Sequence, residues 1–123
     1  MRLSWSVTFL LASTLTFYPA IAQQPAPVKI VGIGATTCGE FAHESKMNPA
    51  SQRNYLAWMQ GYMSGIIIGR PPGVDEGIDL NPRSFPLSQQ LAFIREYCLR
   101  EPSHSFADAV EALYKQLKDA NAT

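Results

Sequence analysis

The sequence of 123 residues has few of the side chains from which catalytic and metal sites are usually built. It contains two histidines and two cysteines, and the cysteines are 98 − 38 = 60 positions apart, so no Cys-x-x-Cys redox motif occurs. His43 has no second histidine one helical turn away, as a zinc-binding helix requires. We therefore expect His43 and His104 to face solvent, and we predict no metal, no cofactor and no enzymatic activity.

An excess of charge of either sign is also absent. Lysine and arginine together number 10, and aspartate and glutamate together also number 10. A balance of this kind gives no electrostatic reason to expect nucleic acid or an anionic membrane surface as a partner. The sequence instead favours a protein partner, which need not carry an opposite charge.

Beyond its first residues the chain has no apolar run long enough to cross a bilayer, which takes about 20 residues. The first residues themselves have the parts of a secretory signal: Arg2, an uncharged apolar run over residues 7–18, and Ala20-Ile21-Ala22 as a small-x-small cleavage pattern. We therefore predict a signal peptide over residues 1–22, cleaved near Ala22-Gln23. The mature protein is then bacterial, periplasmic or secreted, and has no stable membrane insertion; an uncleaved anchor is the alternative.

Both cysteines lie in the predicted mature part. In an oxidising compartment an even pair of cysteines forms a disulfide, so we predict a Cys38–Cys98 bridge. Closing a loop of this length stabilises a fold by about 4 kcal/mol in the chain-entropy treatment. Two free buried thiols are the alternative.

Helical patterns occupy most of the mature sequence. Thr37 and Glu40 have the spacing of a capping box, and Asn48-Pro49 is typical of a helix start. We predict helices over residues 37–46, from 49 to about 69, from 86 or 88 to before Pro102, and from 103 or 105 to about 118. A flexible arm or an extended strap precedes them over residues 23–35, a loop occupies 70–85, and 119–123 is a frayed C-terminus. Residues 36–118 are therefore predicted to form one compact all-α domain of four helices with one disulfide.

An aromatic stripe runs along the second predicted helix, where Tyr55, Trp58 and Tyr62 follow three-four spacing. Packing in the core explains such a stripe. Amphipathic anchors for a protein partner are the functional alternative, because aromatic side chains of this kind are enriched at interfaces. Gly61 and Gly65, four positions apart, predict the close approach of another helix.

The loop over residues 70–85 contains three prolines and two glycines and has no periodicity. Loops of this length without secondary structure are uncommon and are often functional, so we name Asp75, Glu76 and Asp79 as candidate contacts. A calcium loop of the EF-hand type is the alternative. The alternation of ligands and the final glutamate that such a loop needs are absent.

Several motifs together resemble a known family. These are Thr37-Cys38-Gly39-Glu40-Phe41 at a helix start, the helix with Trp58, Gly61, Tyr62 and Gly65, the second cysteine in a later helix, and Pro102 before a last helix with Phe106-Ala107-Asp108-Ala109-Val110. Over residues 36–118 the chain resembles the HdeA/HdeB-like group of small periplasmic helical proteins. The helix with the Trp/Tyr-x-x-Gly-Tyr-x-x-Gly pattern is also similar to Tai-type immunity proteins of type VI secretion.

The first resemblance implies an acid-stress chaperone that binds unfolding client proteins, and a homodimer is compatible with it. The second implies an immunity protein that neutralises a secreted cell-wall-degrading effector. A small hydrolase is a third hypothesis. The loop over residues 70–85 is longer than in those chaperones, and the lysine-rich ends of those chaperones are absent. These departures affect the predicted activity more than the predicted fold.

Overall fold

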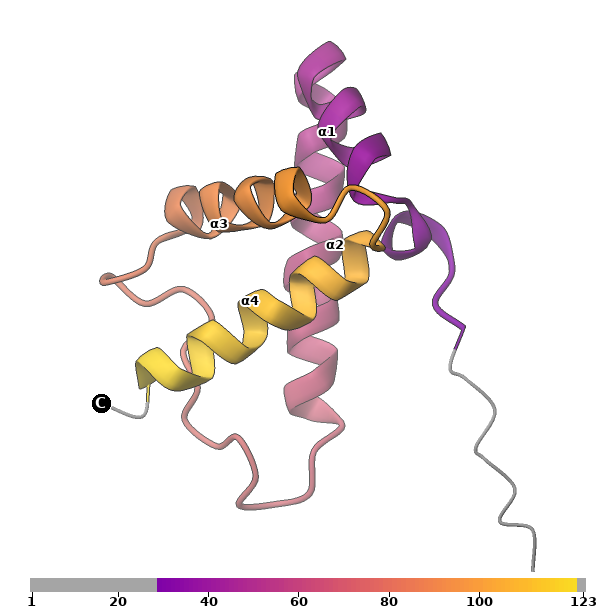
Figure 1. Ribbon diagram of the computed structural model, residues 1–123. Coiled ribbons are helices and arrows are strands. Elements are labelled where there is room, and N and C mark those ends of the chain that lie inside the picture. Colours follow the sequence, from indigo (N-terminus) through magenta and orange to yellow (C-terminus); the bar gives the residue numbers. More distant parts are fainter. Residues whose placement is uncertain (1–28, 122–123) are drawn as a thin grey trace, which may run out of the picture.

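The computed structural model describes residues 29–121 and consists of four α-helices preceded by a short 3-10 helix (Figure 1). The elements are η1 (Gly32–Ala35), α1 (Cys38–Met47), α2 (Pro49–Ile68), α3 (Leu87–Arg100) and α4 (Phe106–Asn121). Residues 29–121 contain no β-strand, and the predicted all-α, four-helix fold with one disulfide is confirmed. The predicted signal peptide and the first part of the predicted arm lie outside the described residues.

Side-chain caps define three of the helix starts. Thr37 and Glu40 form a capping box at α1, because the Thr37 hydroxyl accepts from the Glu40 amide at 3.2 Å and the Glu40 carboxylate accepts from the Thr37 amide at 2.7 Å. The Asn48 side chain accepts from the Ala50 amide at 2.9 Å at the start of α2. Ser105 caps α4 and exchanges hydrogen bonds with Asp108. These caps satisfy amides that have no partner inside a helix.

In Figure 1 the long helix α2 stands behind α3 and α4, which both pass across it, while α1 lies beside its first half. α1 packs against α2 and α3, and α4 packs against α2 and α3. Three rings at the meeting point of α1, α2 and α4 form an aromatic cluster: Phe41 lies 4.9 Å from both Tyr55 and Phe106, and Tyr55 lies 4.8 Å from Phe106 between ring centroids. The core continues along α2 and α4 through Met59, Met63, Val110, Leu113 and Leu117.

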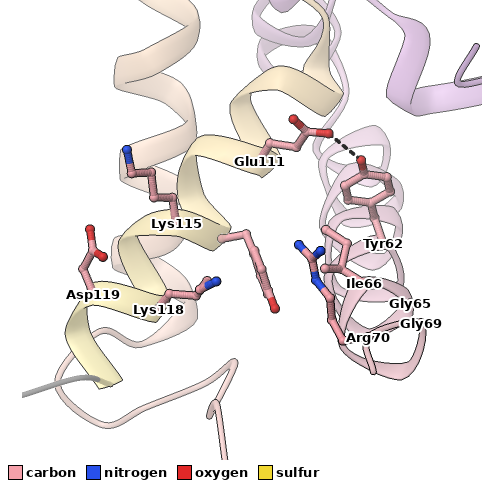
Figure 2. Close-up of a pocket in the computed structure, with 10 residues that line it drawn as sticks. Tyr62, Gly65, Ile66, Gly69, Arg70, Glu111, Lys115, Lys118 and Asp119 are labelled. Carbon is pink, nitrogen blue, oxygen red and sulfur yellow. Dashed lines mark hydrogen bonds between the residues drawn. The ribbon is translucent and has the colours of Figure 1, made fainter. Parts of the chain in front are cut away.

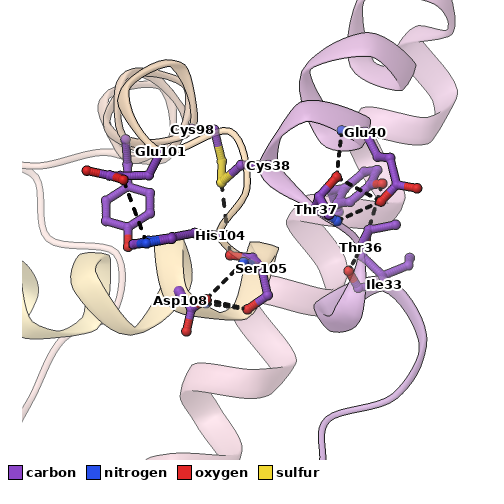
Figure 3. Close-up of a disulfide and its surroundings, with 12 residues drawn as sticks. Ile33, Thr36, Thr37, Cys38, Glu40, Cys98, Glu101, His104, Ser105 and Asp108 are labelled. Carbon is purple, nitrogen blue, oxygen red and sulfur yellow. Dashed lines mark hydrogen bonds and ion pairs between the residues drawn. A yellow bond between two sulfur atoms is a disulfide. The ribbon is translucent and has the colours of Figure 1, made fainter.

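The disulfide Cys38–Cys98 joins the first residue of α1 to the last turn of α3, with the two Cα atoms 4.7 Å apart (Figure 3). Backbone hydrogen bonds reinforce this junction: the Phe106 amide donates to the Thr36 carbonyl at 2.7 Å, and the Cys38 amide donates to the His104 carbonyl at 2.8 Å. We call the disulfide together with these paired segments, residues 36–39 and 102–106, the stapled end.

Residues 32–35 differ from the predicted flexible arm, because they form η1 and pack against α2 and α4. Ile33 contacts the core, and the buried Gly34 lies directly against Trp58. A Cβ atom at Gly34 would overlap the Trp58 ring, so the lack of a side chain permits the close approach.

The end of α4 also differs from prediction, since the helix continues to Asn121 instead of fraying from residue 119. The Asn121 side chain donates to the Leu117 carbonyl at 2.7 Å and to the Asp79 carbonyl at 3.3 Å, and it accepts from the Asp79 amide at 3.1 Å. A contact with the distant loop therefore orders the last turn.

The close approach predicted at Gly61 and Gly65 does not occur among the described residues. A Cβ atom built at either glycine has no heavy atom within 4 Å from residues outside its own helical turn. Both glycines lie on an exposed face of α2.

Candidate functional site

A surface groove of about 810 Å³ lies between the second half of α2 and α4 (Figure 2). Aromatic, apolar and charged side chains line the groove. Gly65 of α2 and Gly69 at its C-cap also line it and have no side chain to project into it. The lining residues are Tyr62, Gly65, Ile66, Gly69, Arg70, Glu111, Tyr114, Lys115, Lys118 and Asp119. A mixed apolar and charged groove of this size suits a peptide segment or a small ligand.

One end of the groove is closed by a hydrogen bond between its two walls. The Tyr62 hydroxyl donates to Glu111 at 2.7 Å (Figure 2). The Tyr62 ring stacks on Trp58 with centroids 4.9 Å apart. Burial, together with the hydrogen bond to Glu111 and its charge, raises the pKa of Tyr62 to about 12. The tyrosine is therefore a neutral donor over the whole physiological range.

Toward the other end, three lining residues of the groove, Arg70, Tyr114 and Lys118, contact a carboxylate from the loop between α2 and α3. Asp75 receives Lys118 Nζ at 2.6 Å, the Tyr114 hydroxyl at 2.8 Å and Arg70 Nε at 3.4 Å. Its side chain is only 6% exposed. We call these four residues the Asp75 cluster. The hydrogen bonds from Lys118 and Tyr114, and the charges of Lys118 and Arg70, hold the pKa of Asp75 below its usual range.

The backbone of the loop turns the Asp75 side chain back toward α4. Asp75 has φ of 59°, in the left-handed region, and Gly73 and Gly77 on either side also have positive φ. Aspartate is among the few residues with side chains that adopt this conformation readily. The Gly73 amide donates to the Glu76 carboxylate at 2.7 Å, which fastens the turn locally.

The three predicted loop contacts do not share a site. Asp75 points into its cluster, Glu76 holds the Gly73 amide, and Asp79 accepts from the Asn81 amide at 2.8 Å while its backbone pairs with Asn121. Each carboxylate therefore has a separate structural partner. Within residues 29–121 no group of three or more His, Cys, Asp or Glu residues is placed to hold a metal ion.

The three aromatic residues of the α2 stripe are buried to different extents. Tyr55 is 2% exposed, sits in the core, and donates from its hydroxyl to Glu44 at 2.9 Å. Trp58 and Tyr62 are half-buried, packed against the core, and Tyr62 borders the groove. Of the three residues named from the sequence, Tyr62 is the one that reaches a candidate site.

Sequence reasoning missed two features that hold the loop. Arg70 and Lys118 are not among the residues singled out from the sequence, yet both pair with Asp75. Gln90 is fully buried, and its side chain donates to the Leu80 carbonyl at 2.9 Å and the Phe85 carbonyl at 3.0 Å. The position of Gln90 four residues before Ile94 and eight before Cys98, on the buried face of α3, is the signal that could have revealed it.

The histidines lie apart from the groove. His43 is exposed on α1. His104 is half-exposed at the stapled end, with its ring 2.8 Å from the Tyr97 hydroxyl and 3.6 Å from Glu101 (Figure 3). None of the helices in the described part of the chain has the length and apolar character needed to cross a membrane.

The described residues form a small, disulfide-bonded helical protein with a surface groove. Residues 5–66 match the model of the HdeA/HdeB family, and the chain belongs to that family, as its sequence motifs predicted. Members of the family are periplasmic, chaperone-type proteins that bind unfolding clients and are not enzymes. No curated protein and no solved structure matches the chain, and the predicted similarity to Tai-type immunity proteins is not supported.

Proposed function

We propose that this chain is a periplasmic acid-stress chaperone that holds unfolding client proteins at low pH. Membership of the HdeA/HdeB family is the observation that carries the proposal. In this proposal the protein reaches the periplasm after cleavage near Ala22-Gln23.

Acid changes the charge of the whole mature protein. Protonating its 10 carboxylates and 2 histidines takes the side-chain charge, without Arg2, from 9 − 10 = −1 to 9 + 2 = +11. Self-repulsion on this scale favours expansion of a small domain. Any protein of this composition undergoes such a change, so a chaperone also needs a defined place at which to open.

The Asp75 cluster supplies a place of that kind. Its single carboxylate lies between Arg70 and Lys118, so protonation leaves two cations side by side without an anion. Because the pKa of Asp75 is lowered in the folded state, its contribution to stability is complete above the pKa of the unfolded chain, about 3.9. That contribution disappears as the pH falls through the lower, folded pKa. The Asp75 contact therefore holds the loop at neutral pH and in mild acid, and this contact is lost in strong acid.

Release of the loop uncovers apolar surface. Ile78, Leu80 and Phe85 of the loop, and Ile66 and Ile67 near the end of α2, are partly buried against the core. Once the loop leaves, these side chains and the adjoining groove become available together. Their partner is an apolar segment of an unfolded chain whose own carboxylates are protonated, so that little charge opposes burial.

The test is the suppression of client aggregation by mature protein, residues 23–123. An aggregation-prone client is incubated at pH 2.5 and at pH 7 with the protein or with an equal mass of an inert folded protein, and light scattering is recorded. We expect suppression at pH 2.5 and little at pH 7. Equal scattering with both proteins at pH 2.5 would sink the proposal. Sedimentation of the same samples measures whether two copies associate.

A further inference from the structure

A second cavity, separate from the groove, lies between α1 and α3 and has a volume of about 320 Å³. Phe41, Ala42, Ser45 and Lys46 of α1 line it together with Arg95 and Leu99 of α3. Its volume is at the lower end of the range for small-molecule sites, which begins at about 300 Å³. A cavity of this size takes a single short chain and excludes a lipid with two chains.

The charges around this cavity are all positive. Lys46 and Arg95 are its only charged lining residues, whereas the groove between α2 and α4 also includes the carboxylates of Glu111 and Asp119. Neither cation has an ion-pair partner among residues 29–121; Arg95 donates to the neutral Gln52 side chain at 2.8 Å. Two unpaired cations beside an apolar cavity create a local positive potential that favours an anion.

A buried hydroxyl points to the same kind of ligand. Ser45 lines this cavity, and its Oγ atom is buried and has no hydrogen-bond partner among the described residues. Buried polar atoms nearly always have a partner, so an orphaned hydroxyl in a cavity wall invites a ligand oxygen. A carboxylate could accept from Ser45 and pair with the two cations at once.

The rest of the lining is apolar. Phe41 is part of the aromatic cluster, and Leu99 is 77% exposed although leucine side chains usually lie in the interior. Phe41 is only 1% exposed, so an alkyl chain in the cavity would mainly cover the surface of Leu99 that now faces solvent. The apolar lining therefore complements the alkyl chain of an amphiphile, and the two cations complement its anionic head.

We propose that the cavity between α1 and α3 binds a single-chain amphiphile with an anionic head, such as a medium-chain fatty acid. Arg95 and Lys46 pair with the carboxylate, Ser45 donates to it, and the chain lies along Phe41 and Leu99. The proposal is independent of the chaperone function, since it uses neither the loop nor the groove.

Calorimetric titration of the mature, disulfide-bonded protein at pH 7 tests this site, with decanoate below its micelle concentration as the probe. Decanol carries the same chain without charge, and decyltrimethylammonium carries the opposite charge. We expect decanoate to bind at least about tenfold more tightly than decanol, because charge-assisted hydrogen bonds add to burial of the chain. No binding of the cation is expected. Equal binding of decanoate and decanol would overturn the anionic head, and no binding of decanoate at millimolar concentration would overturn the site.

Substitutions at the charged lining residues test whether decanoate binds in this cavity. The double substitution Lys46→Gln with Arg95→Gln should weaken decanoate binding at least about tenfold while leaving decanol binding unchanged. Arg53→Gln removes an exposed cation of α2 that does not line the cavity, and it should have no effect. Circular dichroism checks that each variant folds. Unchanged decanoate affinity in the folded double variant would refute the assignment, whatever the outcome of the chaperone assay.

Discussion

The stapled end and the end that carries the Asp75 cluster, which we call the loop end, lie toward opposite ends of α4. The two are held by different kinds of bond. At the start of α4, the Cys38–Cys98 disulfide and backbone hydrogen bonds join the segments that meet there. Near its last turns, the side chains of the Asp75 cluster and the pairing of Asp79 with Asn121 hold the loop. The disulfide and the backbone hydrogen bonds of the stapled end do not titrate in acid, although the Glu40 carboxylate that accepts from the Thr37 amide does. The loop end has no disulfide, and its Asp75 carboxylate titrates.

This difference makes the loop end the more acid-sensitive end of the molecule, because the disulfide holds the stapled end after its carboxylates are protonated. A protein that must expose apolar surface in acid and recover afterwards benefits from an end that opens and an end that does not. The intact disulfide limits how far the chain expands, because residues 38 and 98 stay joined. In the proposed function, opening from the loop end is therefore partial unfolding, with residues 38 and 98 still joined.

The largest expected effect comes from breaking the stapled end. Replacing both cysteines, Cys38→Ser with Cys98→Ser, should lower the free energy of unfolding by about 4 kcal/mol at pH 7. That is a large share of the stability of a small domain. Denaturant unfolding followed by circular dichroism measures it, and reduction of the wild-type protein provides an independent route to the same state. An unchanged midpoint in both experiments would remove the distinction between the two ends.

The next effect concerns the loop end. Asp75→Asn keeps the shape of the side chain and tolerates positive φ, but it removes the charge that pairs with Arg70 and Lys118. We expect faster amide hydrogen exchange over residues 70–85 at pH 7, and more binding of an apolar dye. The wild-type protein should reach that state only below about pH 4.

Asp79→Asn is the matched control for this variant. Asp79 is exposed, and its side-chain contact with the Asn81 amide can be kept by an amide oxygen. This control should behave like the wild-type protein at both pH values. If Asp75→Asn exchanges at pH 7 as slowly as Asp79→Asn does, the Asp75 carboxylate does not hold the loop.

The sequence predicted the stapled end better than the loop end, for physical reasons. The capping box at Thr37, the Asn48-Pro49 start and the cysteine pair are local or compositional signals, and all three are observed. The Asp75 cluster depends on residues from two segments far apart in the sequence, the loop and α4, and on a left-handed backbone at Asp75 itself. No periodic pattern in the sequence predicts that these residues contact one another. Only the presence of a long acidic loop could therefore be predicted.

The same reasoning explains η1. Its sequence, with Gly32 and Gly34, resembles a flexible segment when read alone. Its order comes from Trp58, against which Gly34 packs, and from the Thr36 carbonyl, which pairs with the Phe106 amide. These partners are distant in sequence and become visible only in the folded chain.

The smallest expected effect comes from removing one hydroxyl oxygen at either the loop end or the stapled end. Tyr114→Phe keeps a ring that is 5% exposed and removes one of the donors to Asp75, so it should cost about 1 kcal/mol and should raise the pH at which the loop is released. Tyr97→Phe removes a hydroxyl that contacts His104 at the stapled end and provides the matched control. Hydrogen exchange over residues 70–85, followed from pH 7 to pH 2, should shift for Tyr114→Phe and stay unchanged for Tyr97→Phe. Equal shifts in the two variants would mean that acid loosens the whole domain and that the loop end has no special part in its opening.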